Sequence, residues 1–576
     1  MLFCSANGFY GDPINKKSLM GSLFEVALHR FTTEKKEEAM KNKSSLTTER
    51  YWRSLLYPEN WTRDYIVDGK YIQDFSYAGY RHGEVELPDY MPGPVANVLD
   101  YGADNSGEDD ATGAIQRAID AVQNAGGGTV RLPAGTYKVK PANVGQAALK
   151  ITGSNILLQG DGIGKTLIQG FAENMHKSQL ILVSSASGSW DEVAGAVGSL
   201  AEDVLLPTTN IPVDSTAGFS VGDYVVIRSD RTREFIEEHK MKGFWSADFH
   251  PDTMGPTFYR RIVSVDEGAR SIEIDIPTRY PLKIRDHARI YKVNPPAQRN
   301  VGLMDFSIGN VANHISDGWG EEDYNTPGTG AYEANQAFLI RLSNNIDCFV
   351  KNVATYPAGN EELIHMTSNG LDLDKTKNAT IEHCDFSYPQ YEGGGGNGYG
   401  INICGQETLI KDCSSTSARH SFAFKYSYAN GNVVYHYTST DPKYGSDFHM
   451  YLSMSNLIDN EELNGDFVES VVRPYGAFEG NRHGVTSSQT VFWNTKGNRY
   501  KDGNDYIIDS RQHGYGYIIG TRGAAYQVKT TPTVFHTQYG CLDTAPEDYK
   551  EGIGEGDTLY PQSLYYDQLE KRRGKR

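Results

Sequence analysis

The feature that most constrains the fold of this 576-residue chain is a unit that occurs three times between residues 369 and 453. Each copy holds two short runs in which apolar and polar residues alternate: residues 370–374 with 378–384, 400–404 with 407–413, and 421–425 with 432–437. Self-similarity at a spacing of roughly 20 to 50 residues is typical of repeat proteins, in which each unit buries its apolar face against its neighbours. Alternation with a period of two indicates strands. The repeats therefore predict stacked β-coils, most simply a parallel β-helix.

The alternation also predicts which side chains fill the solenoid. The apolar positions are expected to point inward: Leu371, Leu373, Ile401, Ile403, Phe422 and Phe424. Equivalent outward positions of successive coils stack about 4.8 Å apart, which gives two columns: Asp372, Asn402 and Ala423, then Asp374, Cys404 and Lys425. In the run 446–454 the same alternation sends Phe448, Met450, Leu452 and Met454 inward and displays Asp447, His449, Tyr451 and Ser453 outward.

A second pattern lies upstream of the repeats. Residues 97–104 predict a strand, residues 109–119 a capped amphipathic helix, and residues 126–137 a glycine stop followed by another strand. This combination resembles the opening of the pectate-lyase-like superfamily, whose members are all-β, right-handed parallel β-helices with a helix that covers the first coil. The resemblance implies that fold. It does not select a chemistry, because the superfamily includes lyases, hydrolases, epimerases and phage tailspikes.

Five segments are expected along the chain. Residues 1–94 form an N-terminal cap or arm, with one or two helices and an extended part that lies on the solenoid, and residues 95–184 begin the β-helix with its capping helix. In residues 185–298 the coil pattern lapses, and runs such as 222–227 and 271–276 indicate an inserted small β-subdomain. Residues 299–550 hold the main coils, and residues 551–576 are a C-terminal tail whose end, 570–576, is expected to be solvated.

Composition limits the partners. A formal net charge of −18 argues against nucleic acid as a partner, yet an anionic substrate can still bind in a local basic groove.

The six cysteines include no paired Cys-x-x-Cys, so no zinc or redox motif is present. Cys384 and Cys413 fall at equivalent positions of adjacent coils and are predicted to be stacked, buried thiols. No run approaches the roughly 18 apolar residues of a membrane span. The first six residues are too short for an intact signal peptide. A monomer is expected.

Residues that can transfer protons or bind anions gather on one outer face. We predict these as catalytic: Arg419, His420, Lys425, Asp447, His449 and Tyr451. A lyase needs a cation or metal to neutralise a uronate carboxylate, a base for the neighbouring proton and an acid for the leaving oxygen. Arg419, Lys425 or Arg482 could neutralise, His420 or His449 could be the base, and Tyr451 the acid. The predicted substrate-binding residues surround them: Asp372, Asp374, Glu392, Asn397, Tyr399, Asn402, Arg482 and His483. Glycines 393–396 permit close approach of a ligand to the backbone.

Two alternatives to a lyase remain at this point. Asp372 and Asp374, about 6.5 Å apart on one strand face, could serve a hydrolase with Glu392 or Asp447. Residues 369–420 also partly resemble the polygalacturonases, but Pro389-Gln390 stands where those enzymes have an aspartate pair, which disfavours hydrolysis. The other alternative is a non-catalytic carbohydrate-binding β-helix. The preferred prediction is β-elimination on an acidic, uronate-containing or sulfated polysaccharide, in a protein that is secreted or on the cell surface. Cofactors are not indicated, apart from a calcium site that Asp372, Asp374 and Asp385 could help to form.

Overall fold

The computed structural model describes residues 51–185, 190–247, 255–295, 298–476, 480, 482–537 and 540–574. The chain divides into two units, Met1–Trp52 and Arg53–Arg576, and the fold below is that of the second. The helices expected before residue 50 lie outside the described residues. None of the described helices is long and apolar enough to cross a membrane.

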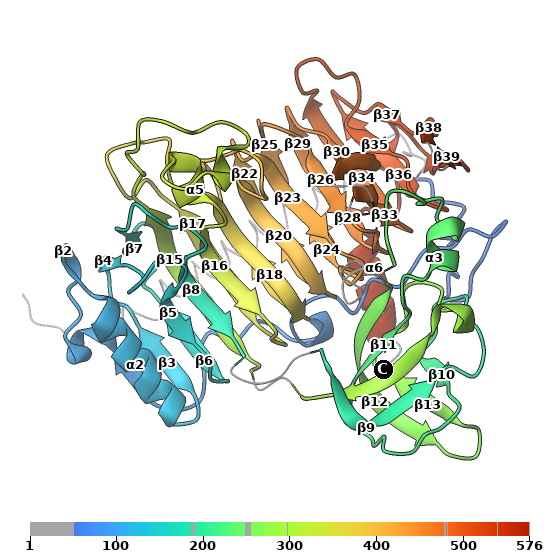
Figure 1. Cartoon of the computed structure of the whole chain (residues 1–576), viewed down its shortest axis with the longest axis horizontal. Helices are drawn as coiled ribbons and strands as arrows, with labels where there is room; N and C mark the ends of the chain where they lie inside the picture. The colour runs from blue at the N-terminus through green and yellow to red at the C-terminus, as the bar shows by residue number, and fades with distance from the viewer. Residues whose placement is uncertain are drawn as a thin grey trace, which may run out of the picture. The chain divides into compact units, whose positions relative to one another are not determined.

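A right-handed parallel β-helix runs through this unit, and one of its faces is a ten-stranded parallel sheet (Figure 1). In spatial order its strands are β5 (Ala147–Ile151), β8 (Gln179–Ser184), β16 (Phe338–Ser343), β18 (Asn369–Lys377), β20 (Tyr399–Gln406), β23 (His420–Lys425), β26 (Ser446–Met450), β30 (Val468–Ser470), β35 (Ile508–Ser510) and β37 (Val528–Lys529).

The other two faces merge into one eighteen-stranded sheet, because β15 (Val301–Asn310) and β34 (Val491–Arg499) run across both. One of these faces holds β1 (Val95–Asn97), β3 (Gly128–Arg131), β6 (Ile156–Gln159), β17 (Phe349–Thr355), β19 (Thr380–Glu382), β21 (Leu409–Lys411), β24 (Val433–Tyr435), β28 (Leu457–Asp459), β36 (Tyr517–Gly523) and β40 (Tyr549–Glu551). The other holds β2 (Ser106–Asp110), β4 (Gly135–Val139), β7 (Thr166–Gly170), β22 (Ser414–Thr416), β25 (Thr438–Thr440) and β29 (Glu462–Asn464).

Stacked apolar ladders form the interior of the β-helix. Leu371 pairs with Ile401, which pairs with Phe422, and all three are fully buried, as the alternation predicted. Cys384 and Cys413 are buried free thiols, and the Cys384 N–H donates to the Cys413 sulfur at 3.4 Å. This arrangement confirms the predicted stack of thiols.

Helix α2 (Thr112–Asn124) covers the first coil at one end of the β-helix (Figure 1). Its buried side chains lie on one face and pack in the main core: Ala114, Ile115, Ala118, Ile119 and Val122. The predicted capping helix is therefore present. Short helices η2 (Val98–Tyr101), η4 (Asp323–Asn325), α5 (Gly330–Ala334) and η5 (Gly556–Thr558) lie in connections between strands.

The insertion is a six-stranded antiparallel sheet, and its hydrophobic cluster also includes residues outside the insertion, such as Leu452 and Met454. Its strands are β9 (Glu192–Ser199), β10 (Asn210–Pro212), β11 (Tyr224–Arg228), β12 (Thr257–Asp266), β13 (Ser271–Ile274) and β14 (Arg289–Val293), with helices α3 (Arg233–Glu238) and η3 (Ile284–Asp286). A buried ion cluster fixes it to the β-helix. Glu407 of the β-helix contacts Arg279 at 2.7 Å and Arg260 at 3.2 Å, and the three side chains are fully buried.

The remaining strands form three two-stranded sheets. β27 (Ser453–Met454) pairs in parallel with β33 (Ser487–Ser488), whereas β31 (Val472–Gly476) with β32 (Arg482–Val485) and β38 (Val534–Thr537) with β39 (Gly540–Asp543) are antiparallel hairpins. The β31–β32 hairpin packs on the insertion through Val472 and Val485.

The segment before the β-helix is an extended arm that lies against the C-terminal helix. The arm contains η1 (Tyr80–Gly83), and the helix is α6 (Leu564–Gly574). Tyr57 donates to Asp567 at 2.6 Å, and Arg572 donates to the Ser76 and His82 carbonyls at 2.8 and 2.7 Å. The prediction that residues 570–576 are solvated is therefore wrong for Arg572, which anchors the arm.

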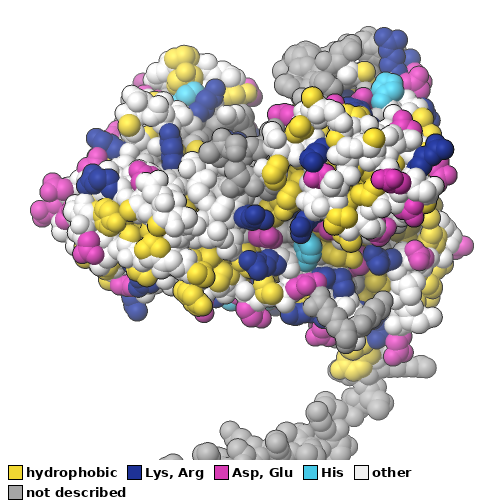
Figure 2. Space-filling view, turned by 90° about the horizontal axis from the view of Figure 1, so that it is seen from below, with side chains coloured by type: hydrophobic (Ala, Val, Ile, Leu, Met, Phe, Trp, Pro, Cys, Tyr) yellow, Lys and Arg dark blue, Asp and Glu magenta, His cyan; other side chains and the backbone are white. Residues whose placement is uncertain are grey.

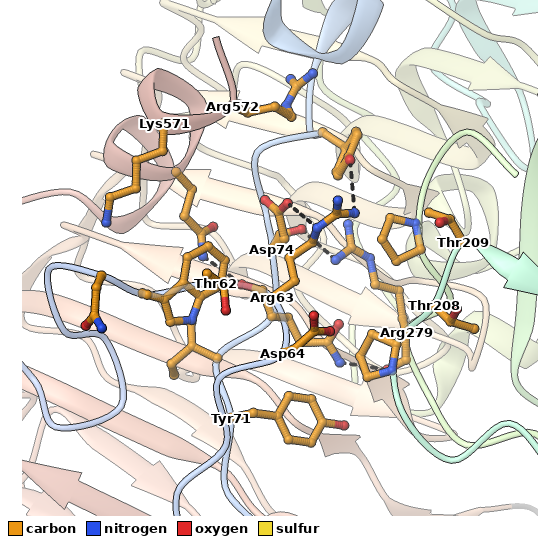
Figure 3. A pocket seen from close by; sticks show the side chains of 18 of the residues that line it. Thr62, Arg63, Asp64, Tyr71, Asp74, Thr208, Thr209, Arg279, Lys571 and Arg572 are labelled. Carbon is orange, nitrogen blue, oxygen red and sulfur yellow. Dashed lines mark hydrogen bonds and ion pairs between the residues drawn. The ribbon is translucent and has the colours of Figure 1, made fainter. Parts of the chain in front are cut away.

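A cavity of about 860 Å³ lies where the arm, the insertion and α6 meet (Figure 3). Its charged side chains already have partners within the protein. Arg279 donates to the Asp74 carbonyl at 2.6 Å, and Arg63 lies 3.9 Å from the Asp74 carboxylate. We interpret this cavity as part of the interface between the arm, the insertion and α6.

Candidate functional site

A groove of about 1240 Å³ crosses the outer face of the ten-stranded sheet. Side chains of β16, β18, β20, β23 and β26 form its floor. Glu321 and Tyr324, which precede α5, and residues of the β31–β32 hairpin also line the groove. Nine predicted site residues line this groove: Asp372, Asp374, Tyr399, Asn402, Arg419, His420, Lys425, His449 and His483.

Asp447 organises the centre of the floor. It is fully buried in β26, and the Nδ1–H of His449 donates to its Oδ2 at 2.9 Å. Arg473 of the hairpin binds the same oxygen and also Glu469, at 2.9 Å. Burial alone would raise the pKa of Asp447, but the neighbouring His420, His449 and Arg473 hold that pKa well below its usual range. Asp447 is therefore an ionised group that orients the ring of His449.

The two histidines beside Asp447 are neutral at neutral pH. Burial lowers the pKa of His449 well below its usual value and lowers that of His420 to about 4. The Nδ1 of His420 lies 2.6 Å from the Gly445 carbonyl oxygen and therefore carries the proton. Its buried Nε2 has no hydrogen-bond partner among the described residues. In both rings Nδ1 carries the proton and donates it in a hydrogen bond, so Nε2 keeps a lone pair that can accept a proton.

Tyr399 and Lys425 complete the centre. The ammonium of Lys425 lies 4.1 Å from the centre of the Tyr399 ring, and that ring lies 5.8 Å from His449 and 5.0 Å from His420. Burial and the Asp447 charge raise the pKa of Tyr399, so its hydroxyl stays protonated. Burial also lowers the pKa of Lys425. The site thus combines a protonated phenol, a buried ammonium and neutral imidazoles.

A second charged group lies along the same sheet. Arg341, on β16, contacts Asp372 at 3.1 Å and Asp374 at 2.9 Å. Burial raises the pKa of Asp372 to about 6. The Oδ1 of Asn402, which pairs with Asp372 in the next coil, is buried without a hydrogen-bond partner among the described residues. Both carboxylates therefore share one guanidinium.

The glycine run 393–396 packs against another segment of the chain. The Gly394 N–H donates to the Glu321 carbonyl at 2.8 Å, and a Cβ on Gly395 would lie 2.5 Å from the Tyr324 ring. These two glycines let the neighbouring segment pack closely, and both also line the groove, so the close approach of a ligand to this run stays a prediction. Gly396 faces the floor, since a Cβ there would lie 3.7 Å from the Lys425 ammonium.

The predicted outward position of Tyr451 is wrong, because the alternation breaks in β26. Lys425 pairs with Met450 after Phe424 pairs with Phe448, so the register shifts by one residue. Met450, predicted inward, lines the groove. Tyr451 has a φ of 60° and is buried in the cluster shared with the insertion. It does not line the groove, so we no longer propose it as the acid.

Three predicted binding residues stand behind the groove walls. Asn397 is fully buried, accepts from the Gln336 N–H at 2.7 Å and donates to the Asn335 amide oxygen at 2.9 Å. Arg482 lies 5.6 Å over Phe244 of the insertion. The Glu392 carbonyl accepts from Arg419 at 3.1 Å, whereas its side chain does not line the groove. These residues support the site and do not face it.

The residues proposed for calcium do not come together. Asp385 accepts from Ser387 at 2.7 Å and from Ser414 at 2.6 Å, whereas Asp372 and Asp374 are bound to Arg341. Ligand-type atoms of His420, Asp447 and His449 do lie within 4.8 Å of one another. However, the Arg473 guanidinium on Asp447 competes with any cation for that carboxylate.

Sequence reasoning missed three residues of the site. Arg341 and Arg473 lie outside the repeated unit, and Tyr444 lies in the turn before β26. Arg419 lies 5.1 Å over the Tyr444 ring and 2.6 Å from Glu321. The only available signal for Arg341 was its place in an apolar strand, where a charged residue at an outward position is easily passed over.

Comparison with known proteins agrees with this architecture. Residues 95–218 match the family model described as "Rhamnogalacturonase A/epimerase, pectate lyase-like". The match covers about a fifth of the chain, and with the parallel β-helix it agrees with the predicted resemblance to the pectate-lyase-like superfamily.

Relatives by sequence come from Azotobacter vinelandii. Alginate lyase 7 is 40% identical over 92 residues, which are 16% of this chain and 11% of that protein. Mannuronan C5-epimerase AlgE5 is 35% identical over 173 residues, 30% of this chain and 17% of that protein. Among solved structures, the A-module of mannuronan C-5 epimerase AlgE4 is 13% identical with a TM-score of 0.31, covering 80% of this chain and all of that one. The matched residues span less than a fifth of the length of the two sequence relatives.

Proposed function

We propose that the groove binds an acidic, uronate-containing polysaccharide and cleaves it by β-elimination. The observation that carries this proposal is the neutral His449, oriented by buried, ionised Asp447 in the floor of an open groove that also presents Lys425 and Arg473. Removing a proton next to a carboxylate requires a base that is unprotonated at the working pH and cations that stabilise the developing charge. Such an enzyme would act outside the cell, where these polymers occur.

Each step has a group to perform it. Lys425 and Arg473 neutralise the uronate carboxylate, which acidifies the proton on C5. The His449 Nε2 takes that proton, and the electron pair forms the C4–C5 double bond as the C4–O4 bond breaks. Tyr399 gives its proton to the leaving oxygen. The products are a new chain end and an unsaturated uronate, so atoms and charge balance.

A second candidate is epimerisation at C5, which the names of the AlgE relatives favour. Its first step is the same proton abstraction. A second group then gives its own proton to C5 on the opposite face of the ring, and no bond of the chain breaks. His449 and Tyr399, both adjacent to the buried Lys425, would be the two proton-transfer groups in either reaction.

One experiment separates the candidates. The full chain is incubated in D₂O with uronate-containing, sulfated and neutral polysaccharides, and ultraviolet absorbance, reducing ends and deuterium at C5 are measured. Absorbance with reducing ends supports elimination. Deuterium at C5 without either supports epimerisation, and reducing ends without absorbance support a hydrolase that uses the groove carboxylates. Binding without any of the three supports a carbohydrate-binding protein and overturns the proposal of an enzyme.

A further inference from the structure

Arg341, Asp372 and Asp374 form a charged cluster in the groove, on the neighbouring strands β16 and β18. Basic and acidic side chains are interspersed over the face drawn in Figure 2, so a pairing of opposite charges is not in itself a binding site. The Arg341 cluster differs because it lines a groove of about 1240 Å³. It also differs in the hydrogen-bonding groups that it leaves open.

Arg341 and Asp374 each have one polar group without a partner. Arg341 directs Nε to Asp372 at 3.1 Å and Nη2 to Asp374 at 2.9 Å, so its Nη1 has no hydrogen-bond partner among the described residues. Asp374 accepts from Arg341 and from the Ser343 hydroxyl, at 3.1 Å, on Oδ2. Its Oδ1 has no partner in the part of the chain that the structure describes. The side chains of Arg341 and Asp374 are 35% and 24% exposed, so a donor and an acceptor lie together in the groove.

The backbone holds these groups in place before a ligand arrives. The register of β16 and β18 pairs Arg341 with Asp372 and Ser343 with Asp374. Asn402 of β20 pairs with Asp372 in the next coil and also lines the groove. This side chain is 5% exposed, and its Oδ1 is unpartnered among the residues that the structure describes. Groups that are already fixed favour binding, because little conformational freedom is lost when the ligand arrives.

The Arg341 cluster lies at a defined distance from the central site at Asp447 and His449. Asp372 pairs with Asn402, which pairs with Ala423 of β23. Ala423 in turn pairs with Asp447 of β26. Three strand spacings therefore separate Asp372 from Asp447, which is about 14 Å. One strand spacing is close to the length of one sugar unit, so a polymer lying along the groove would place a unit over the cluster about three units from the central site.

An open guanidinium N–H beside an open carboxylate oxygen matches two neighbouring hydroxyls of one sugar unit. One hydroxyl donates to the carboxylate, and the other accepts from the guanidinium. A second anion does not match, because a uronate carboxylate or a sulfate placed here would meet two carboxylates beside one guanidinium. An ester on the donating hydroxyl would remove its proton and leave the carboxylate oxygen without a partner. The Arg341 cluster therefore suits the hydroxyl edge of a sugar unit.

We propose that Arg341 and Asp374 form a subsite that recognises two neighbouring, unsubstituted hydroxyls on a sugar unit about three positions from the central site. This inference rests on the proposed function for the identity of the polymer. It makes the two residues specificity-determining, because the groove then takes the charged edge of one unit at its centre and the hydroxyl edge of another at this end. Chains that are too short to reach the subsite, or that are esterified there, bind more weakly.

The test measures binding by the full chain with His449→Gln, so that a bound oligomer is not consumed. Two further substitutions change the subsite. Asp374→Ala removes the acceptor, and Arg341→Lys replaces the planar fork with one ammonium while keeping the charge. Asp412→Ala is the matched control, because Asp412 is a partly exposed aspartate that binds His436 at 2.8 Å and does not line the groove.

Calorimetry compares a uronate disaccharide, a uronate octasaccharide and the same octasaccharide with acetylated hydroxyls, at low and high salt. The disaccharide is too short to span the central site and the subsite together. Thermal unfolding checks that each variant is folded. If Asp374→Ala does not fold, Arg341→Lys carries the test.

We expect Asp374→Ala to bind the octasaccharide about tenfold more weakly, as for the loss of one hydrogen bond to a charged group. Its affinity for the disaccharide should stay within about twofold of the His449→Gln protein. Arg341→Lys should follow the same pattern and Asp412→Ala should not. The loss should persist at high salt, because hydroxyls carry no charge to be screened. Acetylation should weaken the octasaccharide less in Asp374→Ala than in the protein with an intact subsite, since both changes remove the same contact.

Unchanged octasaccharide affinity in both subsite variants would overturn the proposal, and so would an equal loss for the disaccharide or in the control. A loss that disappears at high salt would show that charge, and not the hydroxyls, is recognised there. Absence of octasaccharide binding would overturn the subsite whatever the turnover.

The outcomes also separate this proposal from the proposed function. A parent protein that turns over no polymer, with octasaccharide affinity lost in the subsite variants, would retain the subsite and reject the enzyme. Turnover by the parent protein with unchanged octasaccharide affinity in those variants would do the reverse.

Discussion

Burial has opposite effects on two side chains that touch in the groove floor. Asp447 stays ionised because His420, His449 and Arg473 outweigh the cost of burying its charge. His449 stays neutral because burial outweighs the attraction of Asp447, so its pKa falls well below its usual value. Pairs of groups whose surroundings drive their pKa values apart are typical of acid–base sites. At the scale of the residue, this contrast is the strongest chemical feature of the molecule.

Replacing His449 tests its role as the base. We expect His449→Gln to lower kcat on the uronate polymer by about 100-fold to 10,000-fold, the usual contribution of a general base, while the glutamine can still donate to Asp447. The control is His436→Gln, a half-exposed histidine that lies 2.8 Å from Asp412 on another face. Absorbance of the unsaturated product is the measurement. A His449→Gln protein with more than a tenth of the parent kcat would remove His449 from the mechanism.

The pH profile of kcat/KM follows from the same residues. The base must be neutral, and burial lowers the pKa of His449 below 6.5, so activity should persist as pH falls through 6.5 and decline only at lower pH. Lys425 must be charged, and burial lowers its pKa below 10.5, so the alkaline decline should begin below that value. Lys425→Arg should move the alkaline decline upward, because arginine stays protonated. An unchanged alkaline limb would show that another group titrates there.

At the scale of the element, the repeat predicted the strands and their inward residues, because alternation reports directly which side of a strand is buried. It failed at the end of β26, where Lys425 pairs with Met450 and the strand gains one residue. A register shift of this kind depends on the neighbouring strand and leaves no mark in an alternating run. Arg473 was not predicted as a site residue for another reason. It lies in a hairpin that packs on the insertion, and local periodicity does not report such long-range contacts.

The ion cluster between insertion and β-helix gives an element-scale prediction. Glu407→Gln leaves Arg260 and Arg279 buried without their shared carboxylate. Breaking a buried ion pair from one side typically costs about 3–5 kcal/mol, so the free energy of unfolding should fall by about that amount in a denaturant titration. Glu462→Gln, which loses a partly exposed contact with Lys496 at 3.0 Å, should cost about 0–1 kcal/mol. Similar losses in both variants would show that Glu407 does not hold the insertion.

At the scale of the whole molecule, segments distant in sequence close around the β-helix. The arm, before the first coil, packs on α6, which follows the last one, and the insertion meets both at the cavity of Figure 3. Open solenoid ends expose unpaired strand edges and must be covered. Here α2 covers the first coil, while the arm lies along the flank, where the Gly79 N–H donates to the Glu407 carbonyl at 2.8 Å. The arm therefore links the C-terminal helix to the residue that anchors the insertion.

This arrangement predicts that a change in the last helix loosens the arm nearly 500 residues earlier. Arg572→Met removes the donors to the Ser76 and His82 carbonyls and to Glu84. Hydrogen bonds to charged groups are worth about 1.5–3 kcal/mol, so the free energy of unfolding should fall by about 2–3 kcal/mol. The arm should then be cut first in limited proteolysis, because the least stabilised segment opens most often. Arg499→Met, at an exposed pair with Asp441, should leave the cleavage pattern unchanged. If the first cuts in Arg572→Met fall in the insertion, the arm is held by its own contacts with the β-helix and not by α6.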